Sequence, residues 1–125
     1  MAVSGERLRF TIEAARAVMP DVLEHGSAVV QTRADLAELA AALSRGQDSQ
    51  LGGVAEAKAL EAQLHELLTW FTSAGLELKG WAPLLVDFPA VIDGRDVLLC
   101  WLEGETELGW YHPVELGFPG RRRLG

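Results

Sequence analysis

The chain has 125 residues, of which 49% are hydrophobic and 23% are charged, as in a single globular domain. This composition excludes collagen-like, disulfide-rich and wholly disordered proteins. Eighteen acidic residues against 11 basic ones give a formal net charge of -7, the wrong sign for general binding to a nucleic-acid backbone.

Residues 12–43 carry apolar side chains at alternating steps of three and four. This spacing is a heptad seam, which is typical of helices in coiled coils. Gly26 and Arg33 are the two defects in the seam, because neither offers an apolar side chain.

Pro20 interrupts the seam near its start. Proline lacks a backbone donor and disfavours a helical residue before it. We therefore predict a short helix over 12–18 and a long helix from Pro20 to about Arg45. Residues 46–53 are polar and contain three glycines, which predicts a loop.

A second seam with the same steps covers residues 57–71 and predicts a helix that stops at Ser73–Gly75. Two such helices joined by a short loop pair most simply as an antiparallel hairpin. Each arm is about 30–40 Å long, which is more than a small sheet covers. We therefore predict that part of the seam contacts a second copy, as in a coiled-coil homodimer.

After Gly75 the apolar period changes to two, which predicts strands. We expect one short strand at 76–79 and another at 84–88. Pro89 follows the second strand and is expected to end it.

Asp93-Gly94 lies between apolar runs and is the favoured two-residue hairpin turn. Residues 97–102 are apolar at every position and predict a central strand that is covered on both faces. By alternation, Leu108, Trp110 and His112 are expected to share one face of a further strand.

Together these elements predict an α+β fold in which a long antiparallel helical hairpin packs on a small antiparallel β-sheet. We expect a single domain over residues 1–125. Its helical part covers 10–75, its sheet part covers 76–118, and a basic tail without periodicity covers 119–125.

Six short motifs follow one another along nearly the whole chain: Phe10–Pro20, Val86–Ala90, Asp93–Arg95, Leu99–Trp101, Trp110–His112 and Gly117–Arg122. Together they resemble the bacterial family of domain of unknown function 2203, a resemblance that implies no activity. The family pattern falls on Asp87, Phe88, Pro89, Gly94, Trp101, His112, Gly117, Arg121 and Arg122. Arg123 departs from it, because family members tend to have proline there.

Asp87 lies in an otherwise apolar strand, where a buried carboxylate is costly unless it is paired. Its candidate partners are His112, Arg121 and Arg122. Such a pair either closes the sheet structurally, which is the interpretation we favour, or lines an anion site.

His112 lies at a strand end with Glu115 three positions later. A histidine in this setting is a metal ligand, a proton-transfer group, or, most commonly, a half-buried ring bonded to a carboxylate and a carbonyl. His112 and Glu115 are therefore candidate ligands of a divalent metal ion, although no motif requires a cofactor. Together with Asp87 they are the candidate catalytic residues, and whether the protein is an enzyme stays open.

Aromatic and basic residues near the end of the chain provide a candidate site for a small anionic or planar ligand. The candidate ligand-binding residues are Trp110, Tyr111, Arg121 and Arg122. We predict that Arg122 reaches a carboxylate, Asp87 or Glu115, and that His112 lines the same concavity.

Cys100 is the only cysteine, which excludes an intrachain disulfide and favours a reducing compartment, predicted to be the cytoplasm. Its apolar strand favours packing over nucleophilic chemistry, which would need His112 on the same face of the sheet. No apolar run is long enough for a signal peptide or a membrane span.

Two functions follow from the sequence. The leading hypothesis is a cytoplasmic, homodimeric binding or interaction module with no membrane or nucleic-acid partner. The alternative is a small metal-binding protein or enzyme whose site at the sheet end comprises Asp87, His112, Glu115 and the C-terminal arginines.

Overall fold

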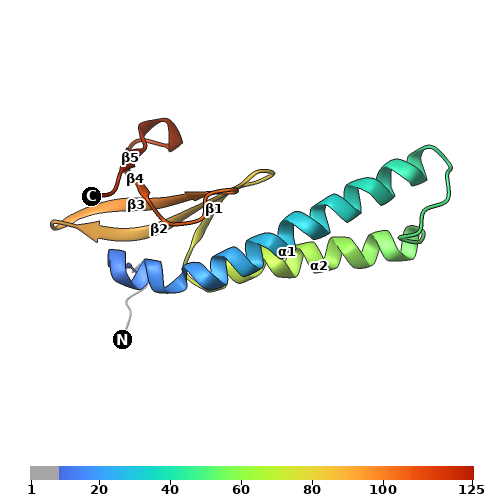
Figure 1. Cartoon of the computed structure of the whole chain (residues 1–125), viewed down its shortest axis with the longest axis horizontal. Helices are drawn as coiled ribbons and strands as arrows, with labels where there is room; N and C mark the ends of the chain where they lie inside the picture. The colour runs from blue at the N-terminus through green and yellow to red at the C-terminus, as the bar shows by residue number, and fades with distance from the viewer. Residues whose placement is uncertain (1–8) are drawn as a thin grey trace.

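The computed structural model describes residues 9–125. Its elements are α1 (Ile12–Ser44), α2 (Val54–Ser73), β1 (Glu77–Trp81), β2 (Leu84–Ile92), β3 (Arg95–Leu102), β4 (Trp110–Pro113), a 3-10 turn η1 (Phe118–Gly120) and β5 (Arg122–Arg123). The helices form an antiparallel hairpin, and the strands form an antiparallel sheet in the order β1-β2-β3-β4-β5 (Figure 1). The predicted α+β fold is confirmed.

The predicted helix break at Pro20 is wrong, because α1 is continuous. The missing N–H would have bonded to the carbonyl of Arg16, and both Pro20 and Arg16 are exposed. The lost hydrogen bond therefore lies on the solvent side of the helix. On the other side Ala15 and Met19 are buried in the core, and this packing keeps the helix continuous.

The two defects in the first seam are contact points with the sheet. A Cβ at Gly26 would lie 3.1 Å from Cη2 of Trp101, so any side chain here would require the indole to shift by a few tenths of an ångström. The Arg33 guanidinium donates to the Trp81 carbonyl at 2.6 Å and to the two Glu103 carboxylate oxygens at 2.9 and 2.8 Å. Arg33 therefore fixes α1 at the point where the helix leaves the sheet.

Beyond Arg33 the helical hairpin extends past the sheet (Figure 1). Here the buried side chains of α1 are Leu39 and Ala42, whereas Ala40 and Leu43, expected in the seam, are exposed. The buried stripe moves by one position because α1 now packs on α2 and no longer on the sheet.

The prediction that Pro89 ends its strand is wrong, because β2 continues to Ile92. The Pro89 carbonyl accepts from the Phe10 N–H at 2.7 Å, so its missing N–H lies on the same side, past the end of β1. Pairing with Leu98 on the β3 side is therefore intact, as for proline at a strand edge.

The predicted hairpin turn is confirmed. Asp93 and Gly94 both have positive φ, 52° and 76°, between β2 and β3. The central strand is also confirmed, since residues 97–101 of β3 are buried. The helices cover one face of the sheet, and the segment that follows β4 covers the other (Figure 1).

Two expectations about the C-terminal part are wrong. Leu108 precedes β4 and belongs to the buried cluster between the helices and the sheet, so it does not share a face with Trp110 and His112. The tail is regular in part, because it forms η1 and then β5, which pairs with β4. Periodicity could not predict these elements, which are only three and two residues long.

Replacing Gly94 tests the turn. Gly94→Val forces a β-branched residue to positive φ, and we expect a loss of more than about 1 kcal/mol in the free energy of unfolding. Urea unfolding measures this loss. Equal stability of the variant and the parent would contradict the turn geometry.

The contact between Arg33 and Glu103 makes stability depend on pH. Arg33, helped by the Leu84 N–H, lowers the pKa of Glu103 below its ordinary 4.5. The stabilisation is therefore complete above pH 4.5 and is lost as the pH falls through the lowered pKa. We expect Glu103→Gln to cost about 1–3 kcal/mol at neutral pH, with a difference that shrinks in acid, as urea unfolding would show. Glu107→Gln, at an exposed position in the same loop, is the matched control.

Candidate functional site

Three polar or reactive side chains meet on the face of the sheet away from the helices, which we call the outer face. Asp87 on β2 and Cys100 on β3 are direct neighbours in the register. His112 on β4 pairs with Leu98, two residues before Cys100. Alternation along each strand places all three on one face, where they are 0–3% exposed.

Asp87 is paired with His112. His112 Nε2 lies 3.2 Å from Asp87 Oδ2, and His112 Nδ1 lies 2.9 Å from the Pro113 carbonyl oxygen. A carbonyl only accepts, so Nδ1 carries the proton of this second bond. The structural pair expected for Asp87 is therefore present. Of its three candidate partners, His112 forms the pair, and Arg121 and Arg122 do not.

The carboxyl group of Asp87 is not fully satisfied by this pair. Its Oδ1 is buried and has no hydrogen-bond partner within residues 9–125. Burial raises the pKa of Asp87, while His112 and, after it, the Cys100 thiol and the charge of Lys79 act in the opposite direction. The Asp87 carboxyl therefore costs free energy of folding, because its buried Oδ1 gives up hydrogen bonds to water and gains none from the part of the chain that the structure describes.

Cys100 meets the geometric condition for a Cys-His nucleophile, since it shares a face with His112. Its ionisation does not meet the chemical condition. Burial, and next the negative charge of Asp87, raise the pKa of the Cys100 thiol to about 12. The thiol is therefore protonated at neutral pH, and the nucleophile is the thiolate. Without a further positive charge at the site, Cys100 does not act as a nucleophile.

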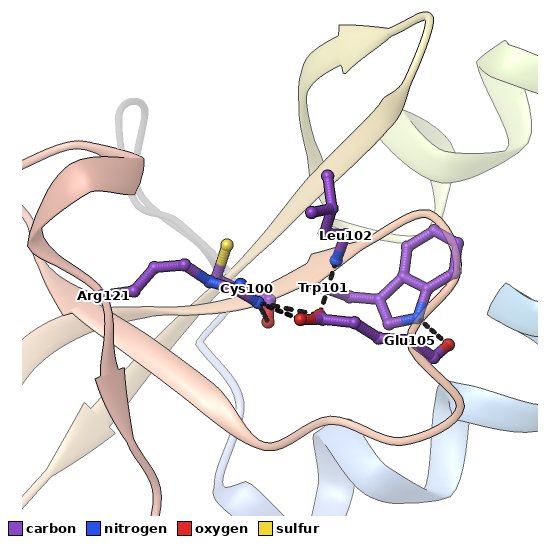
Figure 2. A network of polar contacts seen from close by, with 5 residues as sticks. All are labelled: Cys100, Trp101, Leu102, Glu105 and Arg121. Carbon is purple, nitrogen blue, oxygen red and sulfur yellow. Dashed lines mark hydrogen bonds and ion pairs between the residues drawn. The ribbon is translucent and has the colours of Figure 1, made fainter.

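A second polar cluster lies beside the first, around Arg121 (Figure 2). Its Nη2 donates to both carboxylate oxygens of Glu105 at 2.7 and 2.8 Å and lies 3.3 Å from the Cys100 carbonyl oxygen. Glu105 also accepts from the Leu102 N–H at 2.8 Å, and its carbonyl accepts from the Trp101 indole N–H at 2.8 Å. Arg121 is thus bound to the turn that follows β3.

Aromatic rings also hold Arg121. Its guanidinium carbon lies 4.8 Å from the ring centroids of both Trp110 and Phe118, at the distance of a cation–π contact. The Arg123 guanidinium lies 5.1 Å from the Trp110 ring. Trp110, expected as a wall for a planar ligand, therefore already contacts two guanidinium groups of its own chain.

The ion pair expected for Arg122 is wrong. Arg122 is exposed, and in the described part of the chain no carboxylate lies within ion-pair distance of it. Arg122 and Tyr111 line one concavity, whereas His112 lines another of about 260 Å³, and Glu115 borders both. Arg121 directly follows η1 and is held by Glu105, whereas Arg122 begins β5, so the two arginines have different surroundings.

Sequence reasoning missed the roles of Glu103 and Glu105. Both lie in the turn after β3, and a turn glutamate gives no periodic signal. A usable signal was the presence of two acidic residues directly after a strand that is apolar at every position. Their carboxylates lie near the end of a buried strand, where arginines from the two covering layers can reach them.

The chain is an α+β protein in which a helical hairpin and a C-terminal segment cover opposite faces of a five-stranded sheet. It belongs to the family of uncharacterized conserved proteins DUF2203, which matches residues 9–124. Comparison with curated proteins and with solved structures gave no match. In the part that the structure describes, no helix combines the length and apolar character needed to span a membrane.

The raised pKa of Cys100 predicts an inert thiol. A shift from the ordinary 9.0 to about 12 lowers the thiolate fraction at neutral pH about 1000-fold. We expect DTNB to react with Cys100 at least about 100-fold more slowly in the folded protein than in denaturant. Equal rates in the two conditions would contradict the burial of this side chain.

Proposed function

We propose that the protein is a homodimeric interaction module and that its copies associate through the outer hairpin, which comprises residues 34–62. The observation that carries this proposal is the thin core of the outer hairpin. Within it only Leu39, Ala42 and Ala57 are buried. Most helix stability in proteins comes from packing an apolar face, and these three side chains form a small face for two helices.

Apolar side chains on the outer hairpin also lack cover. Leu43 is 36% exposed and Val54 is 64% exposed, at the end of the hairpin farthest from the sheet. Leu43 and the exposed Ala40 continue the heptad steps of the first seam. The seam is therefore wider than the stripe that α2 covers, and a second copy would bury the remainder.

The sheet does not add to this argument. The central strand β3 is apolar on both faces, which favoured self-association when only the sequence was considered. The C-terminal segment of the same chain covers the outer face, so no second copy is needed there. The proposed interface is therefore confined to the outer hairpin.

Binding of a small anionic ligand by the C-terminal arginines, one of the partners expected from the sequence, is less well supported. Glu105 neutralises Arg121, and two aromatic rings enclose its guanidinium. We further propose that the module works in the cytoplasm, because Cys100 is free and buried, as in proteins of a reducing compartment.

Light scattering coupled to gel filtration tests the dimer. At micromolar concentration we expect about twice the chain mass of 13.6 kDa. The double variant Leu43→Glu, Val54→Glu should shift the mass to that of one chain, because four carboxylates would then meet in the interface. Val91→Glu is the matched control, since Val91 is also 36% exposed but lies on β2, away from the outer hairpin.

The control variant should remain a dimer. A mass of 13.6 kDa for the unaltered protein would overturn the proposal. A dimer that persists in the double variant would show that the interface lies elsewhere.

A further inference from the structure

We propose that Asp87, Cys100 and His112 bind one divalent transition-metal ion, and that zinc matches the site best. Each residue offers one ligand atom, and the three atoms all lie within 4.8 Å of one another. They come from three neighbouring strands at fixed register positions, so the backbone of the sheet holds them together. This site differs from the pair expected from the sequence, in which His112 was joined by Glu115.

The donor set indicates the kind of ion. On binding, zinc would displace the proton of the Cys100 thiol, which is released to solvent. The resulting thiolate sulfur, an imidazole nitrogen and a carboxylate oxygen form a mixed set that suits zinc, a borderline ion with sulfur, nitrogen and oxygen ligands. Magnesium and calcium prefer sets made of oxygen alone, so a site containing Cys100 disfavours them.

The surroundings of His112 already resemble those of a metal ligand. Its Nδ1–H donates to the Pro113 carbonyl, which fixes the ring and directs Nε2 towards Asp87. Metal-bound histidines usually make such a bond with the nitrogen that does not bind the metal. An ion placed between Nε2 and the carboxylate would keep this bond.

The unpartnered oxygen of Asp87 is the second, independent observation. Asp87 is 2% exposed, and the pair with His112 uses only Oδ2, which leaves Oδ1 without a partner in residues 9–125. A purely structural Asp–His pair does not account for this oxygen. A cation beside the carboxylate would compensate for the lost hydration.

The site also has room for a fourth ligand. A cavity of about 260 Å³ reaches Asp87 and His112 and is bordered by Glu115 and Lys79. Zinc is commonly bound by three protein ligands and one water molecule, with the water on the open side. A water in this cavity would complete the tetrahedron.

Titration of metal-free protein with zinc chloride tests the proposal. By calorimetry we expect one zinc ion per chain. Cys100→Ala and His112→Gln should each weaken binding by more than about 10-fold, since removal of an outer partner of a metal ligand already costs 10–100-fold. His65→Gln is the matched control, because His65 is exposed on α2. The zinc affinity of this variant should equal that of the parent.

Cobalt keeps the test decisive if a variant fails to fold. Cobalt bound to the unaltered protein should give a thiolate charge-transfer band in the near ultraviolet, which only ligation by Cys100 can produce in this chain. Absence of zinc binding, equal binding by Cys100→Ala and the parent, or a cobalt spectrum without that band would each overturn the proposal. The dimer proposal uses other residues and another readout, so the two can fail separately.

Discussion

The turn after β3 joins the three layers of the molecule. Glu103 binds Arg33 of α1 on the helical side, and Glu105 binds Arg121 of the C-terminal segment on the outer side. The side chains in these two pairs are 12–23% exposed, so water screens them less than fully exposed pairs. Because two carboxylates two residues apart hold opposite layers, the position of each layer over the sheet depends on this one turn.

This arrangement explains why the outer face can hold polar groups. Arg121 places the C-terminal segment over β3 and β4, and that segment shields Asp87 and His112 from bulk water. A buried carboxylate costs free energy that packing alone does not return. The pairing with His112 offsets part of that cost. The outer face therefore holds a polar group that is only partly compensated, whereas the other side of the sheet packs in an apolar core.

Local patterns were sufficient to predict the helical hairpin and the turn between β2 and β3, but not where every element ends. Asp93-Gly94 predicted its turn because the preference for positive φ is a property of these two residues, and the seams predicted both helices of the hairpin. Pro20 and Pro89 were misleading because the cost of a proline depends on which side of the helix or strand it faces. That side is set by packing on distant residues, which a local pattern does not contain.

The candidate site was predictable only in part. The need of Asp87 for a partner followed from its apolar neighbours, and His112 was among the candidates. The inclusion of Cys100 required the register of three strands, which depends on exact loop lengths. The choice of Arg121 over Arg122 required the boundary between η1 and β5, and no periodicity can be measured over elements of three and two residues.

The order of the strands bears on how the chain reaches this structure. Each strand pairs with its neighbour in the sequence, and the two helices are neighbours as well, so nearly every pairing closes a short loop. Such low contact order favours rapid folding, because little chain entropy is lost before contacts form. The contacts of Phe10 with Pro89 and Val91 are an exception that joins the residues just before α1 to the end of β2. Because about 80 residues separate these partners, we expect this contact to form last, after the hairpin and the sheet have assembled.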